Sequence, residues 1–132
     1  MSGINSENIN AERAPDPVGL YPHAKRVGNL LFLSGVGPRV KGSKEIPQGI
    51  EAQCRSVFEN VKNVLEASGA SWEDLVDVTV FLTDMKHDFP VYNKLWAEYF
   101  ADHQPCRTTV EINCLPTPIS IELKCIAALK ED

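Results

Sequence analysis

The chain has 132 residues, and 13 Lys and Arg against 18 Asp and Glu give it a net charge of −5 and a sequence pI near 5.2. With 43% hydrophobic residues it can fill one core, so length and composition predict one compact domain. A negative total offers no broad cationic face, which argues against general binding of nucleic acids or anionic membranes. An anionic substrate would therefore have to meet a few local arginines or lysines.

The cysteines and the N-terminal sequence bear on the cellular compartment. The four cysteines form no C-x-x-C pair, so we expect reduced thiols and no zinc site. Residues 1–10 are polar and lack the apolar stretch of a signal peptide, and no apolar run approaches the length of a membrane span. These features predict a soluble cytoplasmic protein.

The N-terminal part of the chain is predicted to be a flexible arm followed by a hairpin. Residues 1–17 are polar and end in two closely spaced prolines, which is typical of a flexible segment. The single folded domain is then expected over 18–132. Gly28-Asn29 predicts a tight turn before a mostly buried strand at 30–33.

The middle of the chain is predicted to hold two helices around one strand. Apolar residues spaced at the 3.6-residue period predict a helix over 50–67. Clean alternation predicts a strand over 75–83 whose apolar face begins at Val76. Asp88, with a proline two residues later, predicts the start of a second helix that runs to about residue 102.

The last third returns to strands, at 107–113 and 119–129, around a proline-containing turn. This order of elements predicts an α+β fold in which a mixed sheet carries two main helices on one face. The other face would still present apolar side chains, so a partner subunit is its expected cover. Those side chains are Phe81, Ile126 and Ala128.

Two charged residues stand out as candidates for chemistry. Arg107, at the start of a strand, would point with Thr109 and Glu111 and offer a guanidinium fork to a carboxylate; the alternative is an edge arginine in a surface ion pair. Glu122 interrupts an apolar strand, and it either faces solvent or occupies a pocket that raises its pKa toward general-base use. The residues alone leave both alternatives open.

Other candidates are weaker. Tyr21 is either a surface aromatic or a pocket wall, and Ser34-Gly35 marks either a plain strand end or a close approach of backbone to a ligand. Cys106 is expected to pack as a small hydrophobic residue; the alternative is a thiolate whose pKa is lowered beside Arg107. Three histidines have no spacing suited to a metal or a catalytic triad, and we expect them to be solvated: His23, His87 and His103.

Several segments, taken in order, resemble the reactive-intermediate deaminase family (Rid, YjgF-type). They are residues 27–35, 60–70, 78–84 and 105–111, with Leu115-Pro116 and Ile121-Glu122. The likeness covers about residues 18–129. It implies a chorismate-mutase-like α+β fold and a homotrimer whose sheets meet in a central β-barrel, with active sites between the subunits.

The resemblance also implies roles for single residues. The family's carboxylate-binding arginine falls on Arg107 and its water-activating glutamate on Glu122. Its pocket tyrosine falls on Tyr21, which is expected to reach across from the neighbouring subunit, and its serine–glycine pair falls on Ser34 and Gly35.

The departures from the family pattern point to one branch. Val36, Cys106 and Thr108 stand where most members have glutamine, alanine and serine, and residues 19–26 are richer in cations. This variant resembles the 2-aminomuconate deaminases of meta-cleavage pathways for aromatic compounds. The expected reaction is hydrolysis of 2-aminomuconate to 4-oxalocrotonate and ammonia. The second carboxylate would need another cation, and the candidates are Arg39, Lys25 and Arg26.

No metal or organic cofactor is expected, because an imine is already electrophilic. The alternative activity is general deamination of 2-aminoacrylate-type acids (2-iminobutanoate and 2-iminopropanoate). A second alternative is a non-enzymatic role, either ligand binding or a link to translation. The net charge of −5 argues against RNA as the partner.

Overall fold

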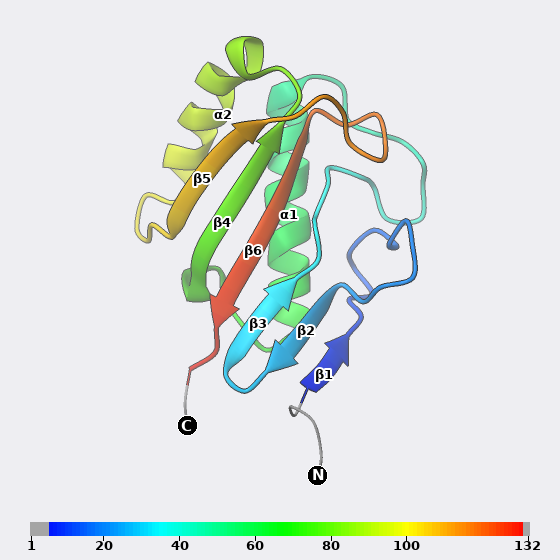
Figure 1. Cartoon of the computed structure of the whole chain (residues 1–132), viewed down its shortest axis with the longest axis vertical. Coiled ribbons are helices and arrows are strands. Elements are labelled where there is room, and N and C mark those ends of the chain that lie inside the picture. The colour runs from blue at the N-terminus through cyan, green and yellow to red at the C-terminus, as the bar shows by residue number, and fades with distance from the viewer. Residues whose placement is uncertain (1–5, 131–132) are drawn as a thin grey trace.

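A mixed β-sheet forms one layer of the protein and two helices form the other (Figure 1). The computed structural model describes residues 6–130. The sheet has six strands in the order β1-β2-β3-β6-β4-β5. The strands are β1 (Ser6–Ile9), β2 (Ala24–Val27), β3 (Leu30–Leu33), β4 (Leu75–Leu82), β5 (Cys106–Glu111) and β6 (Ile121–Ala128).

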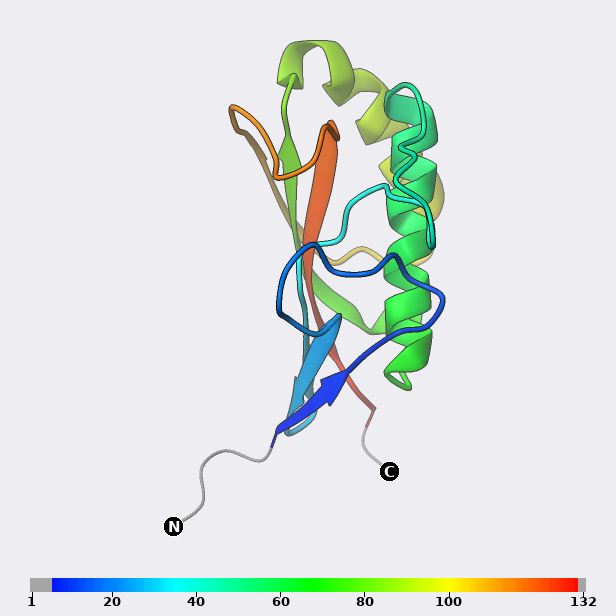
Figure 2. The same cartoon turned by 90° about the vertical axis from the view of Figure 1, so that its right-hand side faces the viewer.

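Both helices, α1 (Ile50–Ala67) and α2 (Met85–Tyr99), cover the same face of the sheet, as Figure 2 shows edge-on. Neighbouring strands run antiparallel except β4 and β5, which are parallel and joined through α2. The predicted α+β class, with two helices on one face, is confirmed.

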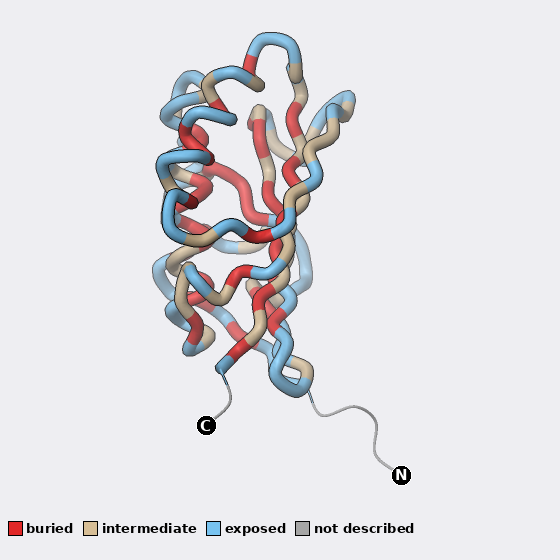
Figure 3. Tube along the Cα trace, turned by 90° about the vertical axis from the view of Figure 1, so that its left-hand side faces the viewer, coloured by how far each residue is buried: buried red, intermediate tan, exposed pale blue. Residues whose placement is uncertain are grey.

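The core lies between the sheet and the helices, and Figure 3 shows buried residues in both layers. The predicted helix at 50–67 is confirmed, and its apolar residues at the helical period face the sheet. Gly69, just past its end, has a φ of 76°, a left-handed conformation that favours glycine. A capping box between Ser71 and Asp74 then opens a single 3₁₀ turn, Trp72–Asp74.

In β4 the predicted pattern fails at one residue. A register irregularity between Leu75 and Asp77 turns Val76 outward, and Val76 is 46% exposed. Val78, Val80 and Leu82 do face the core, and each is fully buried. Val76 is therefore not part of the apolar face, because a bulge breaks the two-residue alternation.

The second helix begins earlier than predicted. Asp84 is its N-cap, and its Oδ1 accepts a hydrogen bond from the N–H of His87. Asp88, the predicted cap, is a buried residue inside the helix, and Pro90 also lies within it. The helix ends at Tyr99 rather than near residue 102. Asp84, two residues after the end of β4, provides the cap, and the helix tolerates the loss of one main-chain N–H at Pro90.

Most of the predicted N-terminal arm belongs to the fold. Residues 6–9 pair with β2 as the edge strand of the sheet, and Ala11 and Ala14 are 2% and 1% exposed. The prediction missed this strand because three of its four side chains are exposed and give no apolar signal. Residues 1–5 of the predicted arm and 131–132 of the predicted domain lie outside the described residues.

Within residues 6–130, no helix or strand covers the helix-free face of the sheet. Leu30 and Phe32 of β3 are 40% and 36% exposed, and three further side chains on this face are half-buried: Phe81, Ile126 and Ala128. The predicted apolar open face is therefore present. Within residues 6–130, neither helix combines the length and the apolar character needed to cross a membrane.

Candidate functional site

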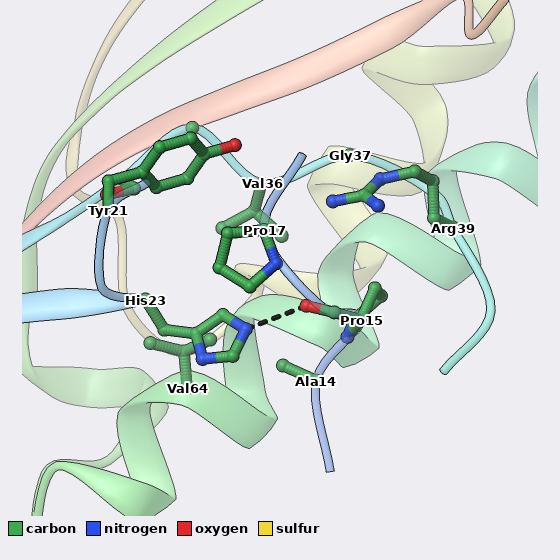
Figure 4. A pocket seen from close by; sticks show the side chains of 11 residues that line it. Ala14, Pro15, Pro17, Tyr21, His23, Val36, Gly37, Arg39 and Val64 are labelled. Carbon is green, nitrogen blue, oxygen red and sulfur yellow. Dashed lines mark hydrogen bonds between the residues drawn. The ribbon is translucent and has the colours of Figure 1, made fainter. Parts of the chain in front are cut away.

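A narrow hollow lies where the loop before β2 and the loop after β3 meet α1 (Figure 4). Four predicted substrate-binding residues line it together: Tyr21, Ser34, Gly35 and Arg39. Arg39 extends its guanidinium toward the hollow from the loop after β3. The other residues of the wall are Ala14, Pro15, Pro17, His23, Val36, Gly37 and Val64.

Hydrogen bonds to the main chain hold these loops in place. Ser34 Oγ donates to the carbonyl of Pro22 at 2.7 Å. Asn60, buried on α1, donates from Nδ2 to the carbonyls of Gly37 and Arg39, both at 2.9 Å. Because Asn60 belongs to a long helix, a rigid element fixes the position from which Arg39 extends.

Glu122, the predicted base, lies on the helix-free face of β6 and adjoins the hollow at Gly35. Two hydrogen bonds between the main chains of Val36 and Leu123, at 2.8 and 2.9 Å, bring the loop after β3 alongside β6. A Cβ at Gly35 would lie 2.8 Å from Oε2 of Glu122, so only glycine lets the carboxylate rest there. Burial raises the pKa of Glu122, and the charge of Arg39 opposes part of that rise.

Arg107 occupies a different place, at the outer edge strand β5 beneath α2. Its guanidinium carbon lies 5.1 Å from the ring centre of Trp96, 5.3 Å from that of Tyr92 and 6.0 Å from that of Phe89. Its Nη1 donates to Oδ1 of Asn93 at 2.9 Å. The predicted direction is confirmed by Thr109, which lies on the same face and hydrogen-bonds to the hydroxyl of Tyr92 at 2.8 Å. The rings and the amide together orient a fixed cation.

Arg107 and Glu122 lie on opposite faces of the sheet. Partners in a β-ladder share a face, and Arg107 pairs with Val78, whose buried side chain faces the helices. Glu122 instead pairs with Phe81 on the helix-free face. A single chain therefore does not bring the predicted clamp and the predicted base together.

Of the three cations predicted for a second carboxylate, Arg39 lines the hollow and the other two do not. Lys25 and Arg26 are exposed on β2, and Nε of Arg26 donates to the carbonyl of Gly28. Lys124, a cation that sequence reasoning overlooked, donates from Nζ to the carbonyl of Leu33, directly before Ser34. Its place two residues after Glu122, on the same face of the strand, was a signal in the sequence.

The histidines divide into two groups. His87 is solvated as predicted, with a side chain 78% exposed that hydrogen-bonds to Asp88. The prediction is wrong for His23 and His103, which are half-buried. His103 Nε2 donates to the carbonyl of Leu75, and both ring nitrogens of His23 are hydrogen-bonded. Their partners are main-chain atoms distant in sequence, so spacing between side chains gave no signal.

The four thiols are unpaired, and they occupy two environments. Cys54 and Cys125 are buried, and burial raises the pKa of each thiol to about 12. Cys114 is exposed. Cys106 is also exposed, so the expectation that it packs as a small hydrophobic residue is wrong. It lies at the start of β5, which is an edge strand of the sheet.

Comparison with known proteins places this geometry in a family. The family model described as endoribonuclease L-PSP matches residues 11–129. A RutC family protein of Pyrococcus horikoshii is 44% identical over 92% of this chain and 96% of its own length. The chloroplastic Reactive Intermediate Deaminase A of Arabidopsis thaliana is 36% identical over 97% of this chain and 68% of its own.

Solved structures show the same fold. The yeast protein YEO7 has a TM-score of 0.91 with 37% identity, over 96% of this chain and 100% of its own. Escherichia coli TdcF, solved with bound serine, has a TM-score of 0.88 with 33% identity, over 94% of this chain and 99% of its own. The chain therefore belongs to the endoribonuclease L-PSP family, the RutC/RidA (YjgF) family that includes reactive intermediate deaminases.

Proposed function

We propose that the protein hydrolyses an enamine or imine acid to a keto acid and ammonia. The observation that carries this proposal is the half-buried carboxylate of Glu122, whose pKa is raised by burial and which adjoins a hollow lined by Arg39. A raised pKa makes the carboxylate a stronger base toward water. Deaminase relatives within the family support the same reaction class.

The active site is completed by a second copy of the chain, within a homotrimer. Glu122 and Arg107 lie on opposite faces of one sheet, so a substrate held by both must lie between two subunits. Tyr21, Ser34, Gly35 and Arg39 share a hollow of one chain, beside Glu122. In this arrangement Arg107 reaches the hollow from the neighbour, so Tyr21 and Arg107 come from different subunits, as the family resemblance implies. The uncovered apolar face of the sheet supports such an assembly.

In the reaction, the guanidinium of Arg107 binds the α-carboxylate of the substrate through two charge-assisted hydrogen bonds. The enamine tautomerises to an imine, and Glu122 removes a proton from a water molecule as its oxygen attacks the imine carbon. Glu122 gives the water proton to the nitrogen, which leaves a neutral tetrahedral intermediate that carries a hydroxyl and an amino group. Glu122 then takes the proton of that hydroxyl and passes it to the amino group while the C=O bond forms and the C–N bond breaks, so ammonia and the keto acid remain.

Release of ammonia from 2-aminoacrylate tests the reaction class. For Glu122→Gln we expect retained binding and loss of turnover by roughly 10²-fold or more, because the amide cannot accept the proton. For Arg107→Lys we expect a large loss in kcat/KM, because lysine keeps the charge but not the fork. Turnover at the wild-type rate in both variants would reject the proposal.

The finer proposal is that the substrate is the dicarboxylate 2-aminomuconate, with Arg39 holding the second carboxylate. Arg39 supports this because it extends toward the hollow from a loop anchored by Asn60. Arg39→Ala should lower kcat/KM roughly 10-fold or more for 2-aminomuconate and little for the monocarboxylate 2-aminoacrylate. An equal effect on both substrates would favour a general 2-aminoacrylate deaminase instead.

A further inference from the structure

His23 joins two points of the N-terminal segment, and its hydrogen bonds define its protonation state. The N–H of Ala11 donates to Nδ1 at 2.8 Å, so this nitrogen must present a lone pair. Nε2 lies 2.7 Å from the carbonyl of Pro15, a bond drawn in Figure 4, and a carbonyl only accepts. The neutral imidazole with its proton on Nε2 is the form that satisfies both contacts.

The segment that His23 holds, residues 11–17, is one wall of the hollow. Ala14, Pro15 and Pro17 line it, and Ala14 is almost fully buried. Residues 11–17 form two ion pairs with the rest of the domain, and both pairs are exposed: Asp16 with Lys41 at 2.8 Å and Arg13 with Glu66 at 3.4 Å. Exposed pairs of this kind contribute little to stability. The half-buried hydrogen bonds of His23 therefore hold this wall, together with the packing of Ala11 and Ala14 against the core.

The elements packed around His23 carry several charged or titratable groups. Within the segment itself lies Asp16, whose pKa is lowered by its hydrogen bond to Lys41 and, to a smaller extent, by His23 and Arg39. Arg39 comes from the loop after β3, and Tyr21 from the loop that leads to His23 itself. Helix α1 contributes Val64, which is uncharged, to the wall of the hollow. Glu66 of the same helix is paired with Arg13.

We propose that His23 is a positioning residue that fixes residues 11–17 as a wall of the hollow only while its imidazole is neutral. Protonation places a hydrogen on Nδ1, opposite the N–H of Ala11, so a donor then faces a donor. Either the ring turns away or the segment moves, and in both cases the Ala11 bond is lost. Protonation of His23 thus loosens this wall while the helices and the central strands stay folded.

Amide hydrogen exchange of the full-length protein tests the proposal without any substrate. The matched variant is His23→Gln, since a glutamine amide offers one acceptor and one donor but does not titrate. On passing from about pH 8 to about pH 5.5, we expect exchange at residues 11–17 in the wild type to rise about fivefold relative to this variant, the effect of one lost hydrogen bond. His87→Gln, which removes the solvated histidine, should behave as the wild type does. Equal exchange in wild type and His23→Gln at both pH values would overturn the proposal.

If the His23→Gln variant does not hold residues 11–17 in place, NMR of the wild type provides a second test. The ¹⁵N shifts of the His23 ring should show a protonated Nε2 at neutral pH, and the amide shift of Ala11 should follow the titration of that ring. A proton on Nδ1, or an Ala11 amide insensitive to the titration, would overturn it. An effect on catalysis rests on the proposed function: the KM should rise on acidification in the wild type and not in His23→Gln. Absence of turnover in every variant would count against that function and leave the exchange result standing.

Discussion

Glu122 and Arg107 have opposite charges and contrasting surroundings. Glu122 is a half-buried carboxylate pressed against Gly35, where burial raises its pKa. Arg107 is a guanidinium held over three aromatic rings and bonded to Asn93. The first arrangement costs stability to keep a base reactive, whereas the second stabilises a cation and fixes its direction. The contrast shows how one chain can supply a base and a clamp from separate places.

On the Glu122 side, among changes that leave Glu122 itself unsubstituted, the largest effect is expected from Gly35→Ala. A Cβ there would lie 2.8 Å from Oε2, which is the far end of a flexible side chain, so the carboxylate moves and the fold is kept. We expect kcat for ammonia release to fall roughly 10- to 100-fold with a small change in KM, because a shifted base misses the attacking water. An unchanged kcat would show that the position of the carboxylate against Gly35 is irrelevant.

On the Arg107 side, Asn93 is exposed and can be changed without disturbing the core. Asn93→Asp should pair with the guanidinium and compete with the substrate carboxylate, raising KM roughly 10-fold, while Asn93→Ala should raise it about threefold through lost orientation. Lys94→Ala, its exposed neighbour, is the matched control and should leave KM unchanged. If Asn93→Asp bound substrate as well as the wild type, Arg107 would not be the clamp.

The smallest expected effect is on stability. The folded-state pKa of Glu122 is raised above its ordinary value of 4.5, so the folded state binds more protons and stability falls as the pH rises through the interval between the two values. Glu122→Gln should therefore have a higher Tm than the wild type above this interval and no advantage below it. Thermal unfolding at several pH values checks the sign; a Tm difference independent of pH would contradict it.

Sequence patterns predicted the fold well where one periodicity dominates. The helix at 50–67 was correct because its apolar residues keep the helical period for five turns. The errors came where single residues override the pattern. Val76 is turned out by a bulge, Asp84 provides the N-cap that Asp88 was expected to provide, and the edge strand at 6–9 has a single buried side chain.

For the site, sequence predicted the residue types but not their grouping. Tyr21, Ser34, Gly35 and Arg39 do line one hollow. The separation of Arg107 from Glu122 depends on strand register, which decides the face of each side chain and which no single segment reveals. The two residues that hold the segments around the hollow, Asn60 and His23, bond to main-chain atoms, and such contacts leave no side-chain motif in the sequence.

Mixing two inactive variants tests most directly whether Arg107 and Glu122 act together from different subunits. Glu122→Gln and Arg107→Ala are each expected to be inactive alone. Unfolded together and refolded as mixed oligomers, they should regain ammonia release, because some interfaces then join an intact Glu122 from one chain to an intact Arg107 from its neighbour. Refolding each variant by itself is the control and should restore nothing. Mixed oligomers that form but remain inactive would contradict a site shared between subunits.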